Sequence, residues 1–119
     1  MIKLAVIVFT DLNESHDAKA RVVNALQIVQ ELQEAGDDVT LLFDGAGVVS
    51  VATIADPDHA LHAVYQKVKP KIAGACAYCA KAFHVKDQIE MLSIPLLSDY
   101  KQHPSVRSLL VDGYQVITL

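Results

Sequence analysis

The alternation of short apolar runs with segments of helical periodicity is the feature that most constrains how this chain can fold. Residues 2–9 are a near-continuous apolar run rich in valine and isoleucine, which is typical of a strand buried on both faces of a parallel sheet. Residues 39–43 form a second run of this kind. Three further strands are predicted at residues 71–76 (KIAGAC), 94–98 (IPLLS) and 114–119 (YQVITL).

A long helical pattern lies between the first two strands. Apolar residues recur at spacings of three and four from Ala18 to Leu32, with charged and amide side chains between them. Ser15 is the predicted N-cap, and Gly36 stands where a helix ends in a left-handed residue.

The later helices are indicated by proline, capping residues and periodicity. Asp56-Pro57 predicts a helix start with Asp56 as N-cap, and Pro70 marks its end. Residues 78–92 predict helix that continues from the third strand. Pro104 is the predicted first residue of the last helix, and His103 is expected to help cap it. Residues 48–55 (VVSVATIA) fit a strand, a short helix or an irregular segment.

Strands that alternate with helices predict an α/β fold: one domain over residues 1–119, with three layers and a mostly parallel five-stranded sheet. This arrangement is flavodoxin-like in the broad sense. With 119 residues and 52% hydrophobic side chains, the chain can build a core without disulfide or metal crosslinks.

The charge pattern and the N-terminal run exclude several classes of protein. A net charge of −4 without a run of lysine or arginine argues against nucleic-acid binding and against anionic membranes. The apolar N-terminal run is too short for a signal peptide and is followed by Asp11 and Glu14, and no stretch is long enough for a membrane span. We therefore expect a cytoplasmic protein whose cysteines are kept reduced.

The only two cysteines, Cys76 and Cys79, stand three positions apart where the third strand meets the next helix. Reactive groups in open α/β sheets gather at the carboxyl ends of the strands. Cys76 is therefore predicted at the helix N-cap, where free backbone N–H groups and the helix dipole favour the thiolate. Cys79 is expected about one turn later on the same side.

Four parts of the chain resemble the DsrE/DsrF-like family of small α/β proteins. These are the apolar first strand, LLFDGAGV, CAYCAKAFHV with its strand-end cysteine, and the closing segment IPLLSDYKQHPSVRSLLVDGYQVITL. The resemblance covers essentially the whole chain and implies sulfur relay, in which one cysteine after the third strand accepts sulfane sulfur as a persulfide. It assigns that role to Cys76, with an aliphatic Val85 nine residues later, and gives Cys79 no counterpart. It also implies donor and acceptor proteins and a homo-oligomer, either a trimer or a hexamer.

The residues themselves leave other roles open. Cys76 and Cys79 have C-x-x-C spacing, so they could form a dithiol redox pair or resolve a Cys76 persulfide. The chain could also be a non-catalytic binding subunit with inert buried thiols. A zinc site would draw on both cysteines with His84, or on His59 with His62, but C-x-x-C occurs only once, so neither a metal nor an organic cofactor is predicted.

Residues after the first two strands are candidates for lining a pocket beside Cys76. Asp11 and Asn13 follow the first strand, and Asp44 and Gly45 follow the second. Turn and capping roles are the alternative for all four. Tyr78 is a further candidate, for which packing is the favoured alternative.

Overall fold

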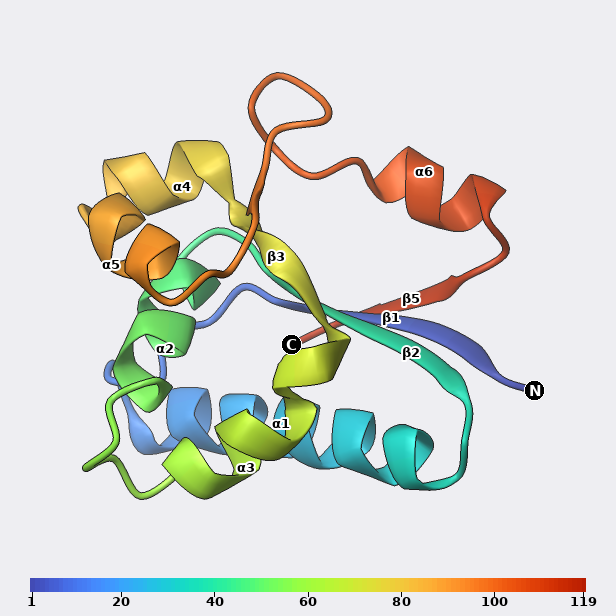
Figure 1. Ribbon diagram of the computed structural model, residues 1–119, viewed down its shortest axis with the longest axis horizontal. Helices are drawn as coiled ribbons and strands as arrows, with labels where there is room; N and C mark the ends of the chain where they lie inside the picture. Colours follow the sequence, from blue (N-terminus) through green and yellow to red (C-terminus); the bar gives the residue numbers. More distant parts are fainter.

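The computed structural model describes residues 1–119 and has one sheet of five parallel strands in the order β4-β3-β2-β1-β5 (Figure 1). The strands are β1 (Lys3–Val8), β2 (Asp38–Phe43), β3 (Ile72–Cys76), β4 (Leu96–Leu97) and β5 (Gln115–Thr118). All five lie within or close to the runs predicted from the sequence. The expected α/β fold with a parallel sheet is therefore confirmed.

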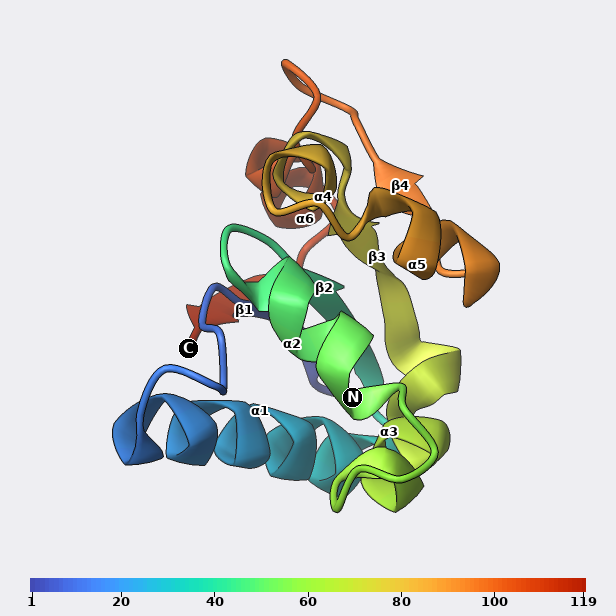
Figure 2. The ribbon, with the colours of Figure 1, turned by 90° about the vertical axis from the view of Figure 1, so that its left-hand side faces the viewer.

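Helices cover both faces of the sheet. They are α1 (His16–Glu34), α2 (Gly47–Ile54), α3 (His62–Val68), the single 3₁₀ turn η1 (Lys69–Lys71), α4 (Ala77–Ala82), α5 (Lys86–Met91) and α6 (Val106–Val111). In both views α1 and α3 lie below the sheet and α6 lies above it (Figures 1 and 2). The layers follow from the strand order, because β1 to β4 step in one direction and the connection through α6 returns to the opposite edge of β1.

The core lies between the central strands and the long helix. Residues 4–8 of β1 are all buried, as expected for a strand covered on both faces. On α1, the apolar stripe that includes Val22, Leu26 and Val29 is inaccessible to solvent and packs in the same cluster as Phe43 of β2. Each such side chain stabilises the fold by about 1.5–3 kcal/mol through burial.

The predicted ends of α1 are confirmed. The Ser15 side chain accepts a hydrogen bond from the Ala18 N–H at 3.0 Å, which satisfies one of the free donors of the first turn. Gly36 follows the helix with φ +80°, a conformation that glycine adopts without a Cβ clash. Residues 48–55, for which the sequence allowed a strand, a short helix or an irregular segment, belong to helix α2 for most of their length.

The predicted helix start at Asp56-Pro57 is wrong, because α3 begins only at His62. The Asp56 carboxylate accepts a hydrogen bond from the Asp58 N–H at 2.9 Å, and this local turn replaces the expected N-cap. His59 Nδ1 accepts from the Leu61 N–H at 3.0 Å and extends the turn. Within α3, Tyr65 and Val68 are buried and form its core-facing side.

The helical stretch predicted at residues 78–92 is two helices. Between α4 and α5, His84 adopts a left-handed conformation with φ +61°. The N–H groups of His84 and Val85 return to the carbonyls of Lys81 and Ala80, which is the Schellman pattern of a helix end.

The start of the last helix also differs from the prediction. The N-cap of α6 is Ser105, which accepts from the Ser108 N–H at 3.1 Å, so Pro104 precedes the helix. His103 therefore does not cap α6, and its ring is free to take part in the site described below.

One glycine is required by close backbone packing. A Cβ on Gly47 would lie 1.9 Å from the backbone oxygen of Val8. The first residue of α2 can approach the end of β1 only because it has no side chain. This contact holds the loop after β2 against the carboxyl end of the sheet.

Candidate functional site

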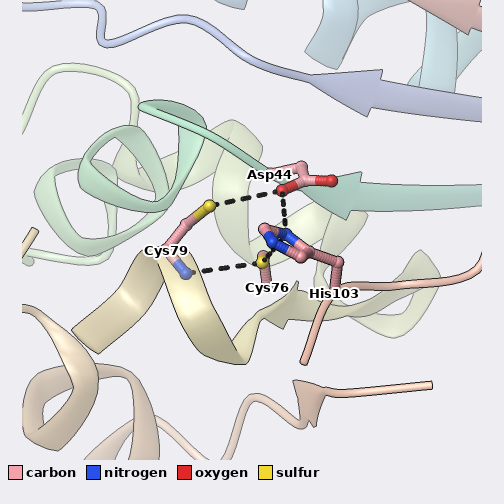
Figure 3. A group of neighbouring side chains, drawn as sticks. All are labelled: Asp44, Cys76, Cys79 and His103. Carbon is pink, nitrogen blue, oxygen red and sulfur yellow. Dashed lines mark hydrogen bonds and ion pairs between the residues drawn. The ribbon is translucent and has the colours of Figure 1, made fainter. Parts of the chain in front are cut away.

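Four side chains from separate parts of the chain converge at the carboxyl ends of β2 and β3 (Figure 3). Asp44 directly follows β2, Cys76 ends β3, Cys79 lies in the first turn of α4, and His103 lies in the loop between β4 and α6. One carboxylate oxygen, two sulfurs and one ring nitrogen all lie within 4.8 Å of one another. Parallel strands bring these residues together because their carboxyl ends share one edge of the sheet.

Cys76 is the centre of this group. Its Sγ accepts a hydrogen bond from the Cys79 N–H at 3.4 Å, which confirms the predicted N-cap position. The same sulfur lies 3.1 Å from Nδ1 of His103 and 3.7 Å from the backbone oxygen of Gln102. A thiol and an imidazole in such contact can exchange a proton.

Asp44 contacts both Cys79 and His103. The Cys79 thiol donates to Oδ1 of Asp44 at 3.5 Å, and the same oxygen lies 3.9 Å from His103 Nδ1. Oδ1 also accepts a hydrogen bond from the Gly45 N–H at 2.8 Å, which fixes the carboxylate. Asp44 and Cys76 approach the same ring nitrogen, so this is not a hydrolytic triad, in which the carboxylate and the nucleophile bind opposite nitrogens.

The loop that carries His103 is tightly held. Tyr100 and His103 exchange two backbone hydrogen bonds of 2.8 Å across a narrow turn. Lys101 and Gln102 between them both have positive φ, at +48° and +68°, which non-glycine residues adopt at a cost of about 1–2 kcal/mol each. The Tyr78 N–H donates to Gln102 O at 3.0 Å and joins this loop to α4.

Tyr78 lies at the edge of the site. Its ring packs against the His103 ring with centroids 5.0 Å apart, while about half of the side chain stays exposed. Tyr78 also lines a surface pocket together with Lys81, Ala82 and Gln102. The contact with His103 limits the rotation of the imidazole.

The electrostatics differ from the sequence-based expectation. Burial raises the pKa of Cys76 to about 12, and this outweighs the opposite effect of the Cys79 N–H hydrogen bond. Burial also raises the pKa of Cys79, against lowering contributions from Cys76 and from the Gly45 backbone. The negative charge of Asp44 raises both further. The helix terminus therefore favours the Cys76 thiolate through the Cys79 N–H, as expected, but desolvation outweighs this contribution and the net pKa is raised.

Access to the two sulfurs is restricted. Cys76 is fully buried and Cys79 is 8% exposed. The Asp44 side chain is 13% exposed, whereas that of His103 is 40% exposed. His103 is therefore the most exposed of the four side chains, and a reagent that approaches Cys76 meets its ring first.

Two of the predicted pocket residues do not join the group. Asp11 Oδ1 accepts two hydrogen bonds of 2.9 Å from Asn13, whose amide also donates to Thr53 on α2 at 3.2 Å. Asp11 and Asn13 therefore have the turn and capping role that was the alternative to lining a pocket. Of the remaining candidates, Asp44 belongs to the site and Gly45 orients it.

The histidines considered as metal ligands from the sequence are not part of this group, which contains His103 instead. His62 contacts the Ile54 carbonyl at 3.1 Å, and His84 ends α4. The signal that could have found His103 is its position in the loop after β4, at the same edge of the sheet as the cysteines. The proline that follows His103 indicated a helix-cap role instead, but Ser105 has that role in the structure.

Comparisons with known proteins support the architecture. No family profile matches the chain. The uncharacterized protein MJ0733 of Methanocaldococcus jannaschii is 28% identical over 118 residues, which cover 99% of this chain and 96% of that protein.

No helix in the structure is long and apolar enough to cross a membrane.

A solved structure from Bacteroides thetaiotaomicron, the conserved protein of unknown function BT1422, has the same fold with a TM-score of 0.70. The match covers 98% of this chain and 95% of that one at 20% identity. The α/β fold of this chain therefore also occurs in that bacterial protein.

Proposed function

We propose that this protein accepts sulfane sulfur on Cys76 and holds it as a persulfide. The observation that carries the proposal is the 3.1 Å contact between Cys76 Sγ and His103 Nδ1 at the carboxyl end of β3. A cysteine paired with a base at the functional edge of an α/β sheet is the arrangement that thiol chemistry requires. The resemblance to sulfur-relay proteins points to the same residue.

The transfer step needs no outside oxidant or reductant. The Cys76 sulfur attacks the outer sulfur of a donor persulfide, R–S–SH, and a new S–S bond forms as the donor S–S bond breaks. The electron pair of the broken bond leaves on the donor sulfur. His103 takes the proton of the Cys76 thiol and returns it to that leaving thiolate, so that the products are Cys76–S–SH and R–SH.

The reaction depends on His103 because Cys76 is held as a thiol and not as a thiolate. A buried thiol with a raised pKa is a weak nucleophile until its proton is removed, and His103 is the base in contact with it. Because the ring covers the sulfur, we expect small persulfides and hydropolysulfide to react directly. A bulky donor protein would first have to displace the 100–103 loop.

Cys79 supports a second candidate function, a dithiol couple. The two sulfurs lie within 4.8 Å, so a modest movement brings them to bonding distance. Attack of Cys79 on the inner sulfur of a Cys76 persulfide would give a Cys76–Cys79 disulfide and release H₂S. A dithiol reductant would then be needed to restore both thiols, which fits a cytoplasmic reaction.

The proposal is tested by the rate of persulfide formation on chelator-treated, reduced protein. His103→Asn should slow the reaction with a small persulfide by about 100-fold or more, because general-base help of that size is lost. His84→Asn, which changes an exposed histidine outside the site, should react like wild type. Equal rates in wild type and His103→Asn would contradict the role of the imidazole.

The expected trimer or hexamer stays a prediction. Helix α6 exposes Val106, Leu110 and Val111 on its surface, which supports association with another copy of the chain. Light scattering on a size-exclusion column would measure the assembly directly.

A further inference from the structure

We infer that Asp44, Cys76, Cys79 and His103 together form a binding site for one Zn²⁺ ion. This inference goes beyond sulfur transfer and does not depend on it. It uses all four groups at once, whereas the persulfide reaction needs only Cys76 and its base.

The spacing of the four groups is close to that of a tetrahedral site. Bond lengths of about 2.3 Å to sulfur and about 2.0–2.2 Å to nitrogen or oxygen place neighbouring ligands about 3.3–3.8 Å apart. The contacts Cys76–His103, Cys79–Asp44 and His103–Asp44 measure 3.1, 3.5 and 3.9 Å, and no pair exceeds 4.8 Å. Binding therefore needs ligand shifts of about 1 Å or less, which side-chain rotations provide.

The donor set favours zinc over other common ions. Two sulfurs, one imidazole nitrogen and one carboxylate oxygen suit a borderline-soft cation with no preferred geometry. Mg²⁺ and Ca²⁺ prefer six or more oxygen ligands, which this site does not offer. Four protein ligands with both sulfurs buried correspond to a closed structural site rather than to one with an open position for substrate.

The surroundings of Asp44 also favour a cation here. Its side chain is 13% exposed, and the only basic side chain within ion-pair distance is His103 at 3.9 Å, with no lysine or arginine beside it. A largely buried carboxylate normally has a cationic partner or a metal. The Gly45 N–H holds Oδ1 at 2.8 Å, which is the kind of outer contact that orients metal ligands.

Zinc binding and sulfur transfer would exclude each other. Cys76 cannot attack a persulfide while its sulfur is bonded to the ion. The metal would therefore keep both thiols out of reaction until it is removed, for example by a chelating thiol.

The test uses the reduced full-length protein, freed of metal by a chelator and desalted. Zn²⁺ affinity is measured by competition with a chromophoric chelator, and Co²⁺ is added separately as a spectroscopic probe. We expect one Zn²⁺ per chain, tetrahedral Co²⁺ bands in the visible, and a thiolate-to-cobalt band in the near ultraviolet. Zn²⁺ should also raise the unfolding temperature of the wild type, because the ion binds the folded state.

Variants assign the ligands. Cys79→Ser, His103→Asn and the nearly isosteric Asp44→Asn should each weaken Zn²⁺ binding by at least about 100-fold, since even outer-shell changes cost 10–100-fold. The matched control His84→Asn should bind Zn²⁺ like wild type. Equal loss in His84→Asn and His103→Asn would overturn the assignment, as would a wild-type Co²⁺ spectrum that lacks the thiolate band.

The outcomes for zinc and for sulfur transfer are separable. Persulfide formation is measured with chelator present, so it can succeed in a protein that binds no Zn²⁺, and that result would overturn this inference alone. Tight Zn²⁺ binding by a protein that forms no persulfide would support this inference and contradict the sulfur-transfer proposal.

Discussion

Alkaline pH should destabilise the protein through Cys76. The pKa of this thiol is about 12 in the folded protein, against an ordinary value of 9.0, because burial disfavours the thiolate. Between these two values the folded state binds more protons than the unfolded state, so the free energy of unfolding falls as pH rises. The contribution of Cys76 is fully present below pH 9 and is lost as pH rises through the folded pKa.

The size of the effect follows from the same two values. At pH 8 neither state is appreciably ionised at Cys76, whereas at pH 10.5 the unfolded thiol is ionised and the folded one is not. The linkage relation then gives a loss of about 2 kcal/mol, and about 4 kcal/mol once pH passes the folded pKa. Against a typical domain stability of about 5–15 kcal/mol, a loss of this size is readily measured.

The assay is urea unfolding at pH 8 and pH 10.5, with reductant and chelator, for wild type and Cys76→Ala. The pKa values of Tyr65 and Tyr114 are also raised, by burial and by Asp38 respectively, but these residues are present in both proteins and their effects cancel. Wild type should lose about 2 kcal/mol more than the variant.

The comparison is repeated in a Cys79→Ala background, because Cys79 contacts Cys76 and its own pKa is also raised. Equal losses in the presence and absence of Cys76 would refute the reasoning. They would mean that the pKa of Cys76 is the same in the folded and unfolded states, so that burial does not disfavour the thiolate.

Three further predictions concern the stability of the scaffold and are tested by measuring the free energy of unfolding in urea. Gly47→Ala should lower the free energy of unfolding by about 1–3 kcal/mol or more, because its Cβ would overlap the Val8 carbonyl; a loss below 1 kcal/mol would contradict the packing of α2 on β1. Ser50→Ala should cost about 1–3 kcal/mol, because the fully buried Ser50 hydroxyl accepts from the Leu12 N–H at 2.9 Å; an unchanged midpoint would argue against that bond. His84→Gly should raise the free energy of unfolding by about 0.5 kcal/mol, because glycine adopts the left-handed conformation at the end of α4 without strain. A lower free energy of unfolding would contradict this conformation.

The sheet could be predicted because its signal is local. The unbroken apolar run at residues 4–8 is short and rich in β-branched residues, which favours a strand covered on both faces, and the structure buries all five residues. The cap at Ser15 and the glycine after α1 are also set by neighbouring residues in the chain. Local patterns failed where two local structures compete, as at Asp56, where a side-chain turn displaced the expected helix start.

The site could be predicted only in part. The carboxyl-end rule located Cys76, Cys79 and Asp44 at one edge of the sheet. It could not place His103, because that side chain reaches Cys76 through a loop with two residues in the left-handed region, across 27 positions of sequence. The raised pKa of Cys76 could not be predicted for a related reason. Burial depends on the whole fold, whereas the N-cap hydrogen bond is local.

The central claim, that Cys76 accepts sulfane sulfur, is tested most directly by intact mass. Reduced, chelator-treated wild type, Cys76→Ser and Cys79→Ser are exposed to a small persulfide and measured together. The account predicts one added sulfur on Cys79→Ser and none on Cys76→Ser, with wild type carrying one sulfur or, after resolution by Cys79, a disulfide. Added sulfur on Cys76→Ser, or no change in any of the three proteins, would contradict it.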